Sequence, residues 1–187
     1  MSNKLDLSNS SFKTCLKKRH LLIPLVCLLL FIFIKYTIEF GSDLNDQSRI
    51  ECLFCNIAHG RITPPKLEFE NDEYVIFKDK SPAATYHYLA IPKQHFHSLK
   101  VLNKSHVGLV ERMQNGMIDF LESKNVSIEN AVIGFHIPPF ISQKHLHLHG
   151  ISPKSEMDLS NRISFFTPSF WFKSANDAIE SLKDADL

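Results

Sequence analysis

The sequence predicts an α+β fold: an antiparallel sheet of about five strands, one long helix and a C-terminal helix, preceded by an N-terminal transmembrane helix. Short aromatic and aliphatic runs bounded by turn-forming residues indicate the strands. Apolar residues at three- and four-residue intervals indicate the long helix. A long apolar run directly behind a basic segment indicates the membrane span.

The chain of 187 residues divides by composition into four segments. We expect a polar, basic tail at 1–20, a single-pass transmembrane anchor at 21–40, a linker at 41–50 and a globular domain at 51–187. A bilayer core needs about 20 apolar residues, which 21–40 provides if Lys35 reaches the interface. A cleaved secretory signal and a buried core helix are the alternatives. Which membrane holds the anchor, and which side the domain faces, stay open.

The globular region contains four segments with strand character and two with helical character. The predicted strands are 74–78, 86–92, 131–137 and 144–151. The predicted helices are 105–121, with Ser105 as its N-cap, and 176–182. Pro138 and Pro139 connect the last two strands, because proline cannot continue a strand ladder.

Charge and histidine content limit the classes of function. Lys plus Arg (21) nearly balances Asp plus Glu (20), so the chain lacks the basic excess that binds nucleic-acid phosphates, and we expect no nucleic-acid partner. The chain has ten histidines, many of them within 87–97 and 145–149. Such clustering calls for a chemical explanation.

The segment His145-Leu146-His147-Leu148-His149 is the most specific pattern in the sequence. In a strand, alternate side chains project to the same face, so the three imidazoles would line one side and the leucines would enter the core. A neutral imidazole is a nucleophile near neutral pH, and a protonated imidazole donates hydrogen bonds to phosphate oxygens, so we expect neutral and cationic rings to share these roles. A solvent-facing polar strand and a pure metal site are the alternatives.

The stretch from His145 to Ile151 resembles the motif of the histidine triad (HIT) superfamily. The sequences of 134–140 and 86–95 are similar to the third branch of the Hint (histidine triad nucleotide-binding) proteins and to their relative aprataxin. The resemblance covers about 52–182 and implies a HIT-like fold for the globular part. It implies a homodimer as well.

The resemblance also implies roles for five residues of the active site. His147 would attack the α-phosphorus and form a covalent nucleotidyl-imidazole, which water then hydrolyses. His149 would hold phosphate oxygens, and His145 would complete the triad. His87 matches the upstream active-site histidine of the family, and Ser142 matches a residue that contacts the leaving group.

Four further residues match the nucleoside-binding positions of the family. Asp79 would bind the ribose hydroxyls, although a turn aspartate before Ser-Pro explains it equally well. Phe54, Ile57 and Phe77 would line the nucleobase pocket, and ordinary core packing is the alternative for them. The lysines at 78 and 80 depart from the first Hint branch and weaken an inherited purine specificity.

A zinc site is implied by four residues that match a Cys2His2 set found in some members of the superfamily. These residues are Cys52, Cys55, His95 and His145. Zinc accepts such ligands tetrahedrally, and C-x2-C supplies two of them from one turn. The zinc would be structural, and no cofactor is required for the chemistry. Simple reduced cysteines are the alternative.

The resemblance implies a hydrolase that cleaves the P–N bonds of adenosine 5′-phosphoramidate and related AMP conjugates. Its substrates would be purine nucleotide conjugates, and its membrane association would come from the N-terminal segment. An aprataxin-like DNA-adenylate hydrolase and a non-catalytic nucleotide-binding scaffold at a membrane are the alternatives.

Overall fold

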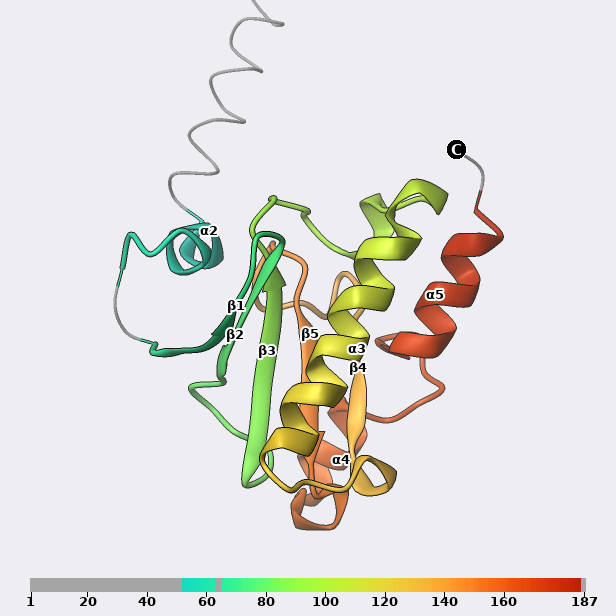
Figure 1. Cartoon of the computed structure of the whole chain (residues 1–187). Coiled ribbons are helices and arrows are strands. Elements are labelled where there is room, and N and C mark those ends of the chain that lie inside the picture. The colour runs from blue at the N-terminus through green and yellow to red at the C-terminus, as the bar shows by residue number, and fades with distance from the viewer. Residues whose placement is uncertain (1–51, 63–64, 186–187) are drawn as a thin grey trace, which may run out of the picture. The chain divides into compact units, whose positions relative to one another are not determined.

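The computed structural model describes residues 52–62 and 65–185, which lie within one compact unit, Arg49–Leu187. The strands of this part are β1 (Leu67–Glu70), β2 (Tyr74–Lys78), β3 (Tyr86–Pro92), β4 (Val132–His136), β5 (Leu148–Ser152) and β6 (Phe172–Ser174). Its α-helices are α2 (Leu53–Ala58), α3 (Val107–Ser123), α4 (Leu159–Ser164) and α5 (Ala175–Lys183). The strands form one antiparallel sheet in the order β1-β2-β3-β5-β4-β6 (Figure 1).

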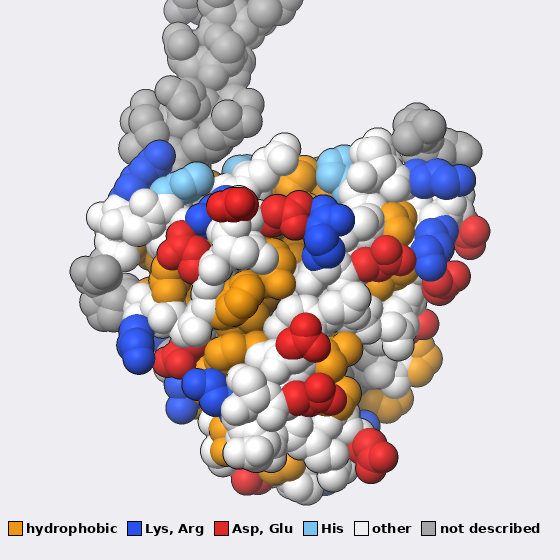
Figure 2. All heavy atoms as spheres, viewed as in Figure 1, with side chains coloured by type: hydrophobic (Ala, Val, Ile, Leu, Met, Phe, Trp, Pro, Cys, Tyr) orange, Lys and Arg blue, Asp and Glu red, His pale blue; other side chains and the backbone are white. Residues whose placement is uncertain are grey.

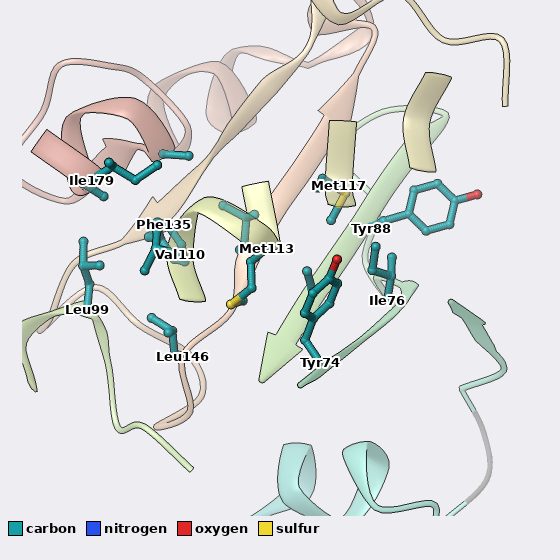
Figure 3. Packing of buried hydrophobic residues seen from close by; sticks show 14 of the residues in the cluster. Tyr74, Ile76, Tyr88, Leu99, Val110, Met113, Met117, Phe135, Leu146 and Ile179 are labelled. Atoms are coloured by element: carbon teal, nitrogen blue, oxygen red, sulfur yellow. The ribbon is translucent and has the colours of Figure 1, made fainter. Parts of the chain in front are cut away.

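The alternation of side chains along the strands divides the core between the two faces of the sheet. Tyr74 and Ile76 of β2 pack in one cluster with Met113 and Met117 of α3 and with Ile179 of α5 (Figure 3). The intervening residues of β2 project to the opposite face, where they pack against α2. The helices α3 and α5 therefore cover one face, and the other face is left to α2 and the segments around it.

The face opposite α3 and α5 carries two separate apolar clusters. One is built on Phe54 and Ile57 of α2, together with residues of β2 and β3. The other contains Ile151 of β5, Phe165 after α4 and Phe172 of β6. His147 and His149 lie between these two clusters, because the ring of His147 meets Phe54 and the ring of His149 meets Phe165.

The predicted elements agree with the structure where the sequence periodicity is strong. The strands at 74–78 and 86–92 are confirmed as β2 and β3, and the two predicted helices correspond to α3 and α5. The sheet has six strands and not about five, and the bounds of the short β1 and β6 were not predicted from the sequence. Ser105 was the wrong cap: Asn103 caps the 3-10 turn Lys104–His106, and α3 begins after it.

The prediction that the fold includes an N-terminal transmembrane helix is wrong. No helix among the described residues is long and apolar enough to cross a membrane. The longest of them, α3, has 17 residues and is amphipathic, whereas a span needs about 20 mostly apolar residues. The segment 21–40, on which the prediction rested, lies outside the described residues.

The contact between β4 and β6 yields a test of this packing. A Cβ at Gly134 would overlap the carbonyl oxygen of Lys173 and lie 2.8 Å from ring atoms of Phe172. We expect Gly134→Ala to lower the free energy of unfolding by about 1 to 3 kcal/mol, because β6 must move away from β4. Gly108→Ala is the control, because only the flexible end of Arg112 lies near its Cβ, at 3.0 Å. Urea denaturation measures both; equal stability of the two variants would contradict the packing.

Candidate active site

The histidines lie on the sheet face opposite α3 and α5. β5 pairs with β3 so that His149 stands opposite Leu89 and Leu148 stands opposite Ala90. Leu146 and Leu148 enter the large core under α3, so the histidines between and beside them project to the other face. The predicted strand starts later than expected: His145 and His147 precede β5, which begins at Leu148.

A cavity of about 400 Å³ opens on this face. Its lining contains seven of the predicted site residues: Phe54, Ile57, Phe77, Asp79, Ser142, His147 and His149. The predicted catalytic residues His87 and His145 are absent from this lining and are buried, with exposed fractions of 2% and 1%. A cleft with an apolar part and a few polar groups is typical of small-molecule sites.

The tautomer of His147 is fixed by the backbone. The Nδ1–H of His147 donates to the carbonyl oxygen of His145 at 2.7 Å, so its Nε2 keeps a lone pair. The ring of Phe54 meets the His147 ring edge to face, with centroids 5.4 Å apart. Burial lowers the pKa of His147, so the ring is neutral near neutral pH. The arrangement presents a neutral imidazole nitrogen as a nucleophile.

His149 lies deeper than His147 and is surrounded by rings. The His147 and His149 centroids are 5.0 Å apart, and the rings of Phe165 and His136 lie 5.1 Å from that of His149. Burial lowers the pKa of His149 well below its usual value, and the neighbouring imidazoles lower it further. Burial also lowers the pKa of His87 to about 4, which Asp79 partly opposes.

The four predicted zinc ligands come together beside the cavity. The ligand atoms of Cys52, Cys55, His95 and His145 lie within 4.8 Å of one another. The Nε2–H of His145 donates to the carbonyl oxygen of Pro92 at 2.9 Å, which leaves its Nδ1 bare. This Nδ1 faces the two cysteine sulfurs at 3.4 Å and 3.5 Å. The residues therefore fit a thiophilic divalent metal, because a histidine ligand must offer a lone pair.

A second group of candidate ligands does not fit a metal. Asp79, His87 and His149 also have ligand atoms within 4.8 Å of one another. However, the backbone N–H of Ala83 donates to Nδ1 of His87 at 3.0 Å, so the ring proton of neutral His87 is on Nε2. The nitrogen that would face the metal therefore carries a proton. Both groups meet the same 4.8 Å distance limit, but only the first group has a histidine whose unprotonated nitrogen faces the other ligand atoms.

The sequence reasoning missed several residues of the site. Gln143 and Leu53 line the cavity, and His136 contacts the rings of His149 and Phe172. β4 and β5 pair with Gly134 opposite His149, which puts His136 on the histidine face. The sequence places His136 in a strand but does not give this register, because an irregular segment separates β4 from the triad. Gln143 was detectable as the neighbour of Ser142.

The buried neutral histidines predict a stability that depends on pH. A pKa lowered from 6.5 to about 4, as for His87, means that the unfolded chain binds more protons than the folded domain between these values. His136 and His149 are also buried and have lowered pKa values. The free energy of unfolding should therefore fall as pH decreases from about 6.5 towards 4.

Urea denaturation at about pH 7 and about pH 5 measures this loss. The variant His136→Phe removes one titrating ring from a wall already made of Phe165 and Phe172, so its pH dependence should be weaker. An unchanged dependence in this variant would show that His136 is not kept neutral by burial.

Comparisons with known proteins identify the family of this chain. The family model described as scavenger mRNA decapping enzyme C-terminal binding matches residues 51–164. Adenosine 5′-monophosphoramidase HINT3 from Xenopus tropicalis is 38% identical over 142 residues, covering 75% of this chain and 93% of that protein. HINT3 from Mus musculus is 41% identical over 136 residues, covering 71% of this chain and 81% of that protein.

More distant relatives share part of the chain. Aprataxin from Danio rerio is 38% identical over 90 residues, covering 47% of this chain and 27% of that protein. The crystal structure of a HIT family hydrolase from Legionella pneumophila superposes with a TM-score of 0.52 at 28% identity, covering 54% of this chain and 91% of the other. The chain belongs to the histidine triad superfamily and is a HIT-family hydrolase.

Proposed function

We propose that this protein hydrolyses the P–N bond of adenosine 5′-phosphoramidate and related AMP conjugates. The observation that carries the proposal is His147, which lines the cavity with its Nδ1–H bound to the His145 carbonyl and its Nε2 lone pair available. The HINT3 relatives, named as adenosine 5′-monophosphoramidases, support the same reaction class.

The reaction proceeds in two displacements at phosphorus. Nε2 of His147 attacks the α-phosphorus and forms a P–N bond, while the bond from phosphorus to the amine nitrogen breaks and the amine takes a proton from water. Water then attacks the nucleotidyl-His147 intermediate, which releases AMP and restores the imidazole. The hydrogen bond to the His145 carbonyl stabilises the positive charge that develops on His147 during attack.

The remaining cavity residues bind the two ends of the substrate. His149 donates to a phosphate oxygen, and Ser142 lies on the lining where the leaving group departs. Asp79 binds the ribose, and its carboxylate also accepts from the backbone N–H of Ser81 at 2.8 Å. Phe54, Ile57 and Phe77 belong to one apolar cluster and form the wall for the purine ring.

An AMP conjugate of small size suits the site better than a DNA end. Lys plus Arg (21) nearly balances Asp plus Glu (20) in the whole chain, and on the α3 face drawn in Figure 2, which is opposite the site, acidic and basic side chains are interspersed. A cavity of about 400 Å³ has the volume expected for a nucleotide-sized ligand. We therefore place the aprataxin-like reaction second to phosphoramidate hydrolysis.

The nucleophile is tested by the variant His147→Ala. We expect AMP release from a fluorogenic adenosine phosphoramidate to fall by at least about 1,000-fold, because the covalent route is lost. His106→Ala is the matched control, since His106 is a helix-capping histidine that packs on Phe96 away from the cavity. Undiminished turnover by His147→Ala would contradict the proposal, as would failure to trap AMP on the wild-type chain by rapid denaturation at alkaline pH, where the P–N bond of a nucleotidyl-histidine survives.

Zinc is the metal that Cys52, Cys55, His95 and His145 would hold, with a structural role. It would tie α2, which follows Cys52, to the segment that carries His147. No step of the reaction passes through it.

The zinc proposal is tested by metal content. We expect about one equivalent of zinc in the purified protein and less in Cys52→Ser/Cys55→Ser, with a melting temperature lower by about 5 °C or more. Asp79→Asn is the control, because the second group does not fit a metal, and its zinc content should be unchanged. Elemental analysis that finds no zinc in the wild-type chain, with no effect of a chelator on melting, would exclude the site.

A further inference from the structure

A chain of hydrogen bonds runs from the backbone into the active site through two imidazoles. The backbone N–H of Ala83 lies 3.0 Å from Nδ1 of His87, and Nε2 of His87 lies 2.9 Å from Nδ1 of His149. Both rings are buried, with exposed fractions of 2% and 5%. His87 lies behind His149 and is absent from the cavity lining, so a direct contact with the substrate does not explain it.

The direction of the chain follows from its first bond. A backbone N–H can only donate, so Nδ1 of His87 must accept and carries no proton. The single proton of the neutral ring is then on Nε2. Two acceptors face this N–H: Nδ1 of His149 at 2.9 Å and a carboxylate oxygen of Asp79 at 3.5 Å. The shorter contact identifies His149 as the acceptor.

The second bond fixes the protonation of His149 in the same way. Because Nδ1 of His149 accepts from His87, its own proton is on Nε2. This Nε2 is the one buried side-chain nitrogen or oxygen of the described residues without a hydrogen-bond partner. A buried donor without a partner is costly, and such donors occur where a ligand atom completes the bond. His149 lines the cavity, so an acceptor atom of a ligand bound there would complete this bond.

We propose that His87 is a positioning residue that holds His149 in its neutral Nε2–H tautomer, ready to donate to the phosphoryl group. His149 then contributes a fixed dipole and not a cationic charge, because an imidazolium would need a second proton on the nitrogen that already accepts from His87. The ring neither gains nor loses a proton during the reaction, so it does not protonate the leaving amine. The catalytic consequence rests on the proposed function, whereas the tautomer itself rests on the hydrogen bonds alone.

The tautomer can be measured without substrate. In long-range ¹H–¹⁵N NMR spectra of the histidine-labelled full chain, we expect His149 to show a protonated Nε2 and a bare Nδ1 near neutral pH, and His87 to show the same pattern. In His87→Leu, the donor to His149 is removed, and we expect the signals of His149 to change to those of exchanging tautomers. His149 with two protonated nitrogens in the wild type, or an unchanged tautomer in His87→Leu, would overturn the proposal.

Kinetics then separate positioning from a general loss of structure. One donor at a developing negative charge is worth about 100- to 1,000-fold in kcat, so loss of its orientation in His87→Leu should lower kcat by at least about tenfold with little change in KM. His87→Gln, whose amide N–H can again donate to His149, should recover a large part of kcat. Equal activity of the Leu and Gln variants would also overturn the proposal. His106→Leu, which removes a histidine outside the chain of bonds, should match the wild type in both assays.

The outcomes distinguish an error in the proposed reaction from an error in the proposed role of His87. If wild-type protein releases no AMP from any phosphoramidate but shows the expected tautomer of His149, the reaction assignment is wrong and the hydrogen-bond chain stands. If the protein is active and His149 is an imidazolium, the reaction stands and the role of His87 is wrong.

Discussion

The antiparallel pairing of β3 with β5 is the constraint on which the site depends. This register sets Leu89 opposite His149 and His87 opposite Ile151, so residues of both strands alternate together between the two faces. The aliphatic side chains that project to one face fill the core under α3 and α5. The residues that alternate with them project to the other face of the sheet, where they pack against α2 and the C-terminal aromatic residues. The histidines lie between these two apolar clusters. A shift by one residue would move the imidazoles into the core.

Burial between two apolar clusters decides the chemistry of these imidazoles. Phe54 on one side and Phe165 on the other exclude water from the rings, which lowers the pKa values and keeps the rings neutral. Neutral rings have one donor and one acceptor each, so every hydrogen bond to a backbone group fixes a tautomer. The backbone groups of Pro92, Ala83 and His145 thereby leave a lone pair on Nδ1 of His145 and on Nε2 of His147, and a proton on Nε2 of His87.

The sequence was informative where a pattern depends on near neighbours along the chain. β2 and β3 were predicted from their apolar runs, and the alternation around His147 indicated three imidazoles on one face. The short β6 was not predictable, because its three residues pair with β4 and have no periodicity of their own. His136 and the burial of His87 required the strand register, which arises from contacts distant in sequence. The membrane helix is absent from the described residues, and the apolar run on which it rested lies outside them. The homodimer and the individual roles of the site residues stay predictions.

The C-terminal strand β6 also determines how the sheet can meet another polypeptide. Its three residues pair with Gly134, Phe135 and His136, so this rim of β4 is already paired within the chain. At the opposite rim, β1 is only four residues long, has an irregular register against β2 and carries Glu68 and Glu70. Short, charged and irregular margins discourage the pairing of strands between molecules. The margins of the sheet beneath the cavity therefore make it a poor template for aggregation.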